Sequence, residues 1–292
     1  MTSIPEIPLF IFHIGNQEYF RKCVLHNSKK NKVYVMGNDS TKDLFPNNKN
    51  VNFIHVKDVD NGEVNRLKTC FKNYSTHDVS YEIKCFLRVF YLKQLMLKTG
   101  IDRFFHLDSD CIVFDNISEV FHANPQIKNA YSVQKYCEKT NPYHMVGCIH
   151  NGLMTLELCN IFINLCFDIY ENKSKLHLIN GKVKHHKNNN MGGGICDMTF
   201  FWLIYSEKLC EIYDLNDIII YEDEECIFDH NVNNDYGIFG ENTYKMNEDN
   251  TKEIIVKDDK RYVSTKNGDK ILRLLSIHFA GPAKKILESI NV

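Results

Sequence analysis

Two aspartates with a single residue between them, Asp108 and Asp110, follow an apolar stretch and are the strongest candidates for chemistry in this chain. Side chains alternate along a strand with a period of two, so both carboxylates can face the same side at its end. A hard cation such as Mn²⁺ or Mg²⁺ prefers oxygen ligands, and phosphate oxygens of a substrate can complete its coordination. The spacing therefore predicts a divalent-cation site that binds a phosphate-bearing ligand.

The chain contains a second copy of this pattern, Asp58-Val59-Asp60. On its own such a pattern is typical of a solvated turn. The later copy differs because the apolar stretches 104–107 and 112–114 flank it, whereas the earlier one runs into Asn61-Gly62. We therefore assign the metal site to Asp108 and Asp110.

Asp197 is the next acidic candidate, because it follows the glycines at 192–194. Glycines allow the backbone to approach a ligand closely, and an acidic side chain at the start of a helix is favoured by the helix dipole. The alternative is that Asp197 only caps the helix. The residue types are compatible with both roles.

The elements around these candidates alternate between strands and helices. Short apolar stretches at 9–14, 33–36 and 51–56 predict strands, and a helix is expected at 19–28. Apolar residues recur at helical spacing over 80–97, and Gly100 ends that helix. This alternation predicts an α/β fold with a mainly parallel sheet.

Later segments complete this pattern. The pieces 103–107 and 111–114 predict extended chain on both sides of the acidic pair, and a long apolar helix is expected to end near Tyr170. We expect a mobile basic loop at 182–190, a hairpin insertion within 241–270, and a core segment at 274–279.

Composition excludes several classes of protein. The 292 residues carry a formal net charge of -2 without a block of like charges, which argues against a nucleic-acid binder. We expect neither a secretory signal nor a membrane span, and the 11 cysteines include no C-x-x-C pair. A cytoplasmic location is expected; the composition is rich in Asn and Lys and is compatible with a large virus or a bacterium. For a viral protein, the location would be the host cytoplasm or the virion.

The order of motifs from about Ile7 to Lys285 resembles the GT-A glycosyltransferases. Leu107-Asp108-Ser109-Asp110 is similar to the D-x-D metal motif of that family. The resemblance implies that the two aspartates bind the metal ion and that Asp108 and Ser109 contact the donor. Arg88 matches an arginine on the helix before that motif. The resemblance implies that Arg88 contacts the donor sugar or its diphosphate.

Further motifs carry the same resemblance. The loop with His13 and Gly15 resembles the segment that holds the nucleotide base, and Asn151-Gly152 is similar to an element beside the donor sugar. The glycines before Asp197 look like a turn in related viral and bacterial sugar transferases.

The segment from His278 to Lys284 resembles the His-x-x-Gly-x-x-Lys signature of glycogenin-like enzymes. In those enzymes the histidine is a third metal ligand and the lysine meets the diphosphate. An imidazole can indeed complete a mostly oxygen shell around Mn²⁺, and a lysine can reach phosphate oxygens as a point charge. Lys285-Ile286 departs from the Pro-Trp that usually follows.

Together these motifs imply one GT-A domain over 1–292, with a nucleotide-binding half at 1–115 and an acceptor-side half at 116–292. The implied activity is metal-dependent transfer of a sugar from a nucleotide-sugar donor, by family habit a UDP-sugar, to a hydroxyl of a glycan or protein. Mn²⁺ or Mg²⁺ is the implied cofactor, held by Asp108, Asp110 and His278. Asp197 is the implied base of an inverting enzyme or an orienting group of a retaining one.

Two other functions remain open. A haloacid-dehalogenase-like phosphohydrolase also places a D-x-D after a strand, with Asp108 as the nucleophile, although that family usually has the motif in its first strand. A sugar-binding GT-A domain without turnover is the non-enzymatic alternative. A nucleotidyltransferase would carry a Gly-rich loop with an arginine after the first strand, and the segment 15–19 lacks one.

Overall fold

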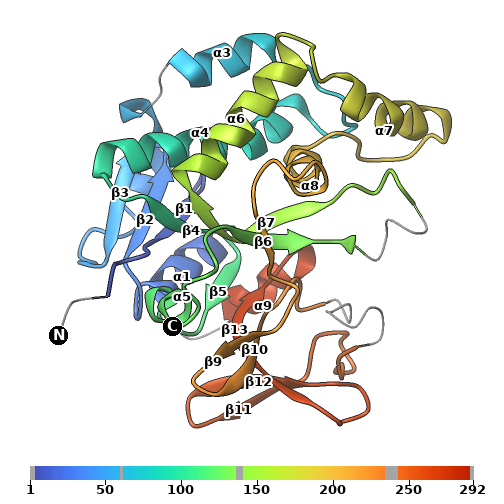
Figure 1. The fold of residues 1–292 in the computed structure, drawn as a ribbon. Coiled ribbons are helices and arrows are strands. Elements are labelled where there is room, and N and C mark those ends of the chain that lie inside the picture. Colours follow the sequence, from blue (N-terminus) through green and yellow to red (C-terminus); the bar gives the residue numbers. More distant parts are fainter. Residues whose placement is uncertain (1–3, 60–61, 136–140, 234–242, 290–292) are drawn as a thin grey trace.

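The computed structural model describes residues 4–59, 62–135, 141–233 and 243–289, which form two β-sheets with helices around them (Figure 1). The first sheet has seven strands in the order β3-β2-β1-β4-β7-β6-β8. Its strands are β3 Val51–His55, β2 Val33–Gly37, β1 Leu9–Phe12, β4 Arg103–Leu107, β7 Gly147–Thr155, β6 Ala130–Val133 and β8 Tyr213–Asp214. The first four run parallel to one another, and β7 lies antiparallel to β4.

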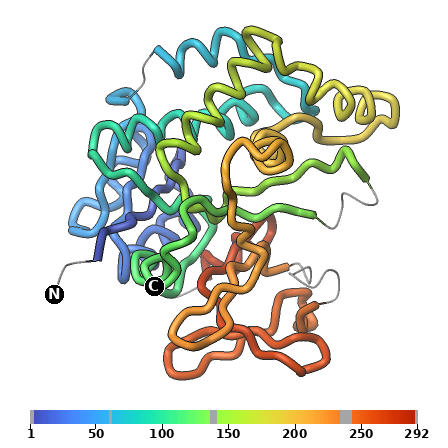
Figure 2. Tube along the Cα trace, in the orientation of Figure 1, coloured from blue at the N-terminus to red at the C-terminus, as the bar shows by residue number. Residues whose placement is uncertain are grey.

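The second sheet is built mainly from the last third of the chain, drawn in orange and red in Figure 2. Its strands are β11 Ile254–Lys257, β12 Lys260–Ser264, β13 Ile271–His278, β10 Glu224–Phe228 and β9 Ile219–Tyr221, and β5 Cys111–Val113 pairs with β13. Because β5 directly follows the acidic pair, the second sheet is tied to the end of β4. The first sheet takes strands from both sides of residue 115.

Helices cover both faces of the first sheet (Figure 1). The helices of the described residues are α1 Glu18–Asn27, α2 Asp39–Lys42, α3 Gly62–Cys70, α4 Val79–Thr99, α5 Ile117–His122, α6 Leu156–Tyr170, α7 His177–Asn188, α8 Asp197–Ser206 and α9 Lys284–Ser289, with 3-10 turns η1 Val56–Asp58 and η3 Gly281–Ala283. The predicted mixed α/β class, a mainly parallel sheet flanked by helices, is confirmed.

Alternation along the strands divides the core into two layers. Phe10 of β1 joins the cluster that includes residues of α4, α6 and α8, whereas its neighbours Leu9 and Ile11 join the cluster that includes residues of α1 and α5. This alternation is what a strand buried on both faces requires, because successive side chains point to opposite sides. In β4, Phe104 joins the first of these clusters and Phe105 joins the second, so the acidic pair also follows a strand with apolar packing on both sides.

The α4 helix that carries Arg88 is capped at both ends. The Asp78 side chain accepts hydrogen bonds from the backbone N–H groups of Ser80 and Tyr81 in the first turn. Gly100 adopts φ 68° and donates its N–H to the carbonyl of Met96 at 2.9 Å. The helix predicted at 80–97 is confirmed, and its ends are set by local sequence.

One segment differs from the prediction. The basic stretch 182–190 is expected to be a mobile loop, but α7 runs to Asn188, and Lys182 is only 4% exposed. The Lys182 ammonium donates to the carbonyl of His144 at 2.9 Å and to the Thr199 hydroxyl at 3.0 Å. The loop prediction is wrong because acceptors from distant segments offset the cost of burying this charge, and local polarity does not reveal them.

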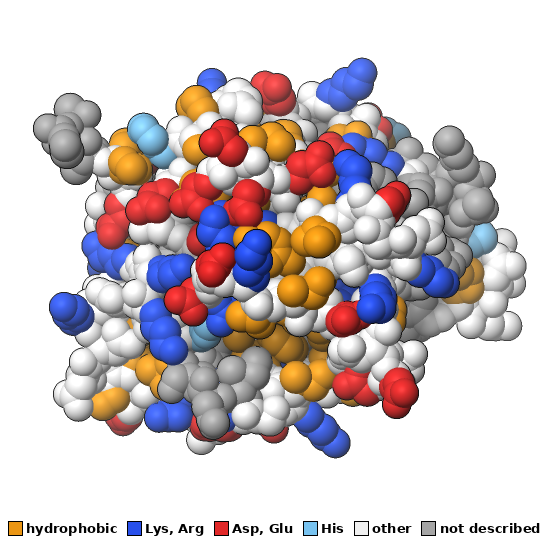
Figure 3. Space-filling view, turned by 90° about the horizontal axis from the view of Figure 1, so that it is seen from below, with side chains coloured by type: hydrophobic (Ala, Val, Ile, Leu, Met, Phe, Trp, Pro, Cys, Tyr) orange, Lys and Arg blue, Asp and Glu red, His pale blue; other side chains and the backbone are white. Residues whose placement is uncertain are grey.

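Hairpin β11–β12 forms where Ile254-Ile255-Val256 pairs with the segment around Tyr262-Val263. Its turn holds Asp258 and Asp259 at positive φ, as two-residue hairpin turns require. Figure 3 shows the molecule from below, with acidic, basic and apolar side chains interspersed on this face.

A buried arginine joins the second sheet to the segment after β5. Arg273 of β13 donates to Asp115, Glu222 and Glu224 at 2.8 Å each.

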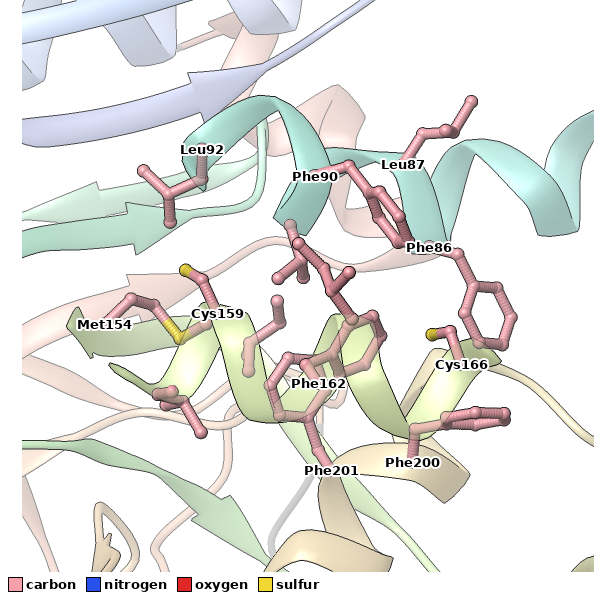
Figure 4. Packing of buried hydrophobic residues seen from close by; sticks show 14 of the residues in the cluster. Phe86, Leu87, Phe90, Leu92, Met154, Cys159, Phe162, Cys166, Phe200 and Phe201 are labelled. Carbon is pink, nitrogen blue, oxygen red and sulfur yellow. The ribbon is translucent and has the colours of Figure 1, made fainter. Parts of the chain in front are cut away.

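Aromatic packing between α4, α6 and α8 holds the helical layer together (Figure 4). Phe162 of α6 is fully buried, and its ring lies 4.6 Å from that of Phe201 and 6.0 Å from that of Phe86. Removing this ring would leave a cavity in contact with all three helices.

We expect Phe162→Ala to lower the free energy of unfolding by about 3–5 kcal/mol, because the transfer energy is lost and the cavity does not fully collapse. Urea denaturation at neutral pH measures the change. Asn164→Ala, on the exposed side of the same helix, should stay within about 0.5 kcal/mol of the wild type. Equal effects of the two substitutions would contradict this account of the core.

Candidate functional site

A cleft of about 470 Å³ opens at the carboxyl ends of β1 and β4, beside α4 and the end of β13. Its lining residues are Phe12, His13, Ile14, Tyr19, Tyr81, Lys84, Cys85, Arg88, Asp108, Ser109, Asp110, His278, Ala280, Gly281 and Lys284. Open α/β sheets bind ligands at this edge. Seven residues singled out from the sequence lie in this lining: His13, Arg88, Asp108, Ser109, Asp110, His278 and Lys284.

Antiparallel pairing of β13 with β5 brings His278 to the acidic pair. In this register His278 lies opposite Cys111, the residue directly after Asp110. The next residue, Phe279, donates its N–H to the Asp110 carbonyl at 2.9 Å. Segments far apart in the sequence thus meet through a backbone ladder.

The Asp110 carboxylate has two positively polarised neighbours. Its Oδ1 lies 3.3 Å from Nε2 of His278, and its Oδ2 lies 3.2 Å from Nζ of Lys284. Nδ1 of His278 lies 2.7 Å from the main-chain oxygen of His230 and donates to it, which directs Nε2 toward Asp110. Burial lowers the pKa of His278, but the hydrogen bond and the charge of Asp110 outweigh it and leave the pKa raised.

Asp110, Cys111 and His278 place one ligand atom each within 4.8 Å of one another. Burial raises the pKa of the Cys111 thiol well above its usual range, so the sulfur is protonated and suits a hard cation poorly. The carboxylate and the imidazole suit Mn²⁺. Asp108, the third predicted ligand, is not one of these three residues, because it faces Arg88 and not His278.

Arg88 joins two carboxylates. Its Nη1 donates to Oδ1 of Asp108, and its Nη2 donates to Oδ2 of Asp197. The Arg88 side chain is 12% exposed and that of Asp197 is 4% exposed, so this ion pair is largely shielded from water. Burial raises the pKa of Asp108, but the Arg88 guanidinium outweighs it and holds the pKa below its ordinary value.

The α4 helix also contributes three lining residues that the sequence reasoning missed. Tyr81, Lys84 and Cys85 line the cleft together with the predicted Arg88, and the four occupy the i, i+3, i+4 and i+7 positions of one helix face. Their spacing relative to Arg88 is the signal in the sequence that could have found them.

The loop after β1 also lines the cleft and is held by side-chain contacts. His13 lies 2.6 Å from the Gln17 amide oxygen, and its ring stacks on Phe20 at 4.0 Å. Gly15 has φ 136°, and its carbonyl accepts from the Thr41 hydroxyl at 2.8 Å. Gly15 shapes the loop without lining the cleft, and its contact with a nucleotide stays a prediction.

Asn151 and Gly152 lie in β7, where they pair with Leu107 and His106 of β4. Both are buried, and the Asn151 amide donates to the carbonyl of Asp229 at 3.2 Å. They support the strand beneath the acidic pair from outside the cleft lining. Their predicted contact with a donor sugar stays a prediction.

Asp197 lines a second pocket of about 230 Å³, which shares Tyr81 and Cys85 with the cleft. The N-cap of α8 is Cys196, so Asp197 is the first helical residue, and the alternative of a simple N-cap is wrong. Gly194 is needed because a Cβ there would lie 2.3 Å from the carbonyl oxygen of Tyr74. Gly194 thus admits a neighbouring backbone segment beside the pocket.

The second copy of the acidic pattern lies elsewhere. Asp58 is exposed in η1, after β3, and lines neither the cleft nor the second pocket. Asp60 lies outside the described residues. Asp58 therefore offers a matched control for substitutions in the cleft.

Among the residues that the structure describes, none of the helices has the length and apolar character needed to cross a lipid bilayer.

The chain is similar to known proteins in its fold and not in its sequence. No protein-family model and no curated protein sequence matches the chain. Similar solved structures include mouse xyloside xylosyltransferase 1 in its apo form, with a TM-score of 0.46 and 16% identity over 72% of this chain and 85% of that one. Another is a cytidylyltransferase from Leptospira borgpetersenii, with a TM-score of 0.34 and 9% identity over 63% of this chain and 73% of that one. Likenesses at this level do not identify an activity.

We expect Arg88→Met to destabilise the metal-free chain by about 3 kcal/mol or more, because it leaves the buried carboxylate of Asp197 and the partly buried one of Asp108 without their cation. The Asp108 share of this stability is fully present above its ordinary pKa of 3.8 and is lost as the pH falls through the lower pKa of the folded chain. Urea denaturation at neutral pH and at pH values below 3.8 measures both effects.

Arg21→Met is the control, because Arg21 pairs with Glu18 on the exposed face of α1. Its effect should stay within about 1 kcal/mol. A loss of stability in Arg88→Met that is unchanged below pH 3.8 would argue against the ion pair as its cause.

Proposed function

We propose that this chain is a metal-dependent glycosyltransferase that moves a sugar from a nucleoside-diphosphate donor, a UDP-sugar, to a hydroxyl acceptor. The observation that carries the proposal is the cleft in which Asp110 and His278 face each other between Arg88 and Lys284. A carboxylate, an imidazole and two permanent cations at the carboxyl edge of a parallel sheet suit a metal-bound diphosphate.

Charge balance supports a diphosphate as the ligand. Asp108 and Asp197 share the charge of Arg88, and Asp110 lies beside Lys284. Mn²⁺ or Mg²⁺, held by Asp110 and His278 with Asp108 nearby, would when bound neutralise charge on the leaving diphosphate. Lys284 would then turn from Asp110 to the phosphate oxygens.

The loop after β1 supplies a part of the cleft that suits a nucleotide base. The His13 ring is fixed by Phe20, and Tyr19 lies beside it with its ring 5.0 Å from Nζ of Lys284. Flat rings next to a phosphate-binding cation provide a surface for a planar base. We propose that this loop holds the nucleoside.

Asp197 lies on the other side of Arg88 from Asp108. Since its Oδ2 accepts from the guanidinium, its Oδ1 is the oxygen with which it would orient an acceptor hydroxyl or take its proton. The link through Arg88 places this carboxylate next to the donor cleft, which is where the two reactants must meet.

Asp110→Ala should abolish metal-dependent binding of UDP while leaving the fold intact, because it removes the carboxylate between His278 and Lys284. Titrating the protein with UDP-sugars and GDP-sugars, with and without Mn²⁺, measures the shift in melting temperature that binding produces. The control Asp58→Ala should respond like the wild type.

Unchanged affinity of Asp110→Ala for the metal–nucleotide complex would remove Asp110 from the site. If no nucleotide sugar shifts the melting temperature of the wild type with metal present, the glycosyltransferase proposal fails. Release of phosphate from an aryl phosphate that depends on Asp108 would instead support a phosphohydrolase. UDP-sugar binding without hydrolysis or transfer would support a sugar-binding domain.

A further inference from the structure

The second pocket lies between the start of α4, α7 and the start of α8. Its volume is about 230 Å³, which is below the range of about 300–1,000 Å³ for pockets that enclose drug-sized molecules. Tyr81, Glu82, Tyr143, Lys182 and Asp197 line it. A space of this size holds one small ring and is too small for a nucleotide.

Glu82 is a buried residue of this lining, and its two carboxylate oxygens differ in their hydrogen bonding. Its exposure is 1%, and Oε1 lies 2.8 Å from Nδ1 of His77, which donates to it. Within the described part of the chain, Oε2 has no hydrogen-bond partner. A buried acceptor without a donor is costly, so a ligand that supplies an O–H group would gain from meeting it.

The buried cation of this pocket is already satisfied. Nζ of Lys182 donates to the carbonyls of His144 and Met145, at 2.9 Å and 3.4 Å, and to the hydroxyl of Thr199 at 3.0 Å. An ammonium has three hydrogens, so these contacts use all of them. Lys182 therefore holds α7 against its neighbours and offers nothing to a phosphate.

The two cavities thus select opposite chemistry. Lys284 and Arg88 make the cleft suitable for an anion, whereas Glu82 and Asp197 give the second pocket acceptors for hydroxyl hydrogens. Tyr143 adds an aromatic wall, backed by the His185 ring at 4.7 Å. Carboxylate acceptors beside an aromatic face suit the hydroxyls and the C–H face of a sugar ring.

We propose that the second pocket binds one sugar ring of a saccharide acceptor, with Oε2 of Glu82 accepting a hydrogen bond from a ring hydroxyl. This inference rests on the proposed function and narrows its acceptor from any hydroxyl to a glycan. The Arg88 guanidinium binds one carboxylate of each cavity, so a ring in this pocket lies next to the donor.

The test measures binding of methyl glycosides of common hexoses and pentoses to the full chain with Mn²⁺ and UDP present, by saturation-transfer NMR and by melting temperature. The wild type should bind at least one glycoside. Glu82→Gln should weaken that binding by about tenfold or more, because an amide nitrogen replaces a charged acceptor. The matched control Glu157→Gln changes an exposed residue of α6 and should bind like the wild type.

Binding of metal and UDP is measured separately on each variant, so the two proposals fail independently. Tyr143→Leu supplies a second test if Glu82→Gln does not fold, and it should also weaken glycoside binding. Equal glycoside binding by wild type, Glu82→Gln and Tyr143→Leu would overturn the inference. So would an absence of glycoside binding by a wild type that binds metal and UDP, or transfer to a serine or threonine peptide that Glu82→Gln leaves unchanged.

Discussion

The buried guanidinium of Arg88 is the interaction on which both cavities depend. It holds Asp108 at the end of β4 and Asp197 at the start of α8, so one side chain of α4 fixes the distance between the cleft and the second pocket. Each carboxylate alone would be costly to bury, and the shared cation makes the arrangement stable. The packing of α4 against α6 and α8 in turn holds Arg88 in place.

A second constraint is the backbone pairing of β13 with β5. It delivers His278 to Asp110 by main-chain hydrogen bonds, which no surface substitution readily disturbs. Behind it, the main-chain oxygen of His230 orients the imidazole, and the His150 ring stacks on it at 4.7 Å. The second sheet therefore serves as a support for one side chain of the cleft.

The two cavities are lined by different side chains, and this difference would decide which reactant binds in each. One cavity combines basic side chains with two aspartates and an imidazole, and the other combines carboxylates with an aromatic wall. A nucleoside-diphosphate donor would be disfavoured in the second pocket by the small volume of that pocket and by its carboxylates. Tyr81 and Cys85 line both, so the reacting groups would meet beside them.

Local sequence determined strands β1 to β5, the β11–β12 hairpin, the α4 helix and the acidic pair, because their patterns depend on neighbours a few residues away. The resemblance to a known family, which rests on the order of motifs along the chain, also singled out Arg88, Asp110, His278 and Lys284. Only the tertiary structure decided that Asp108 faces Arg88, that Lys182 is buried in a helix, and that Glu82 lines a pocket. These outcomes depend on acceptors, donors and packing surfaces that come from distant segments, and no local pattern of residues encodes them.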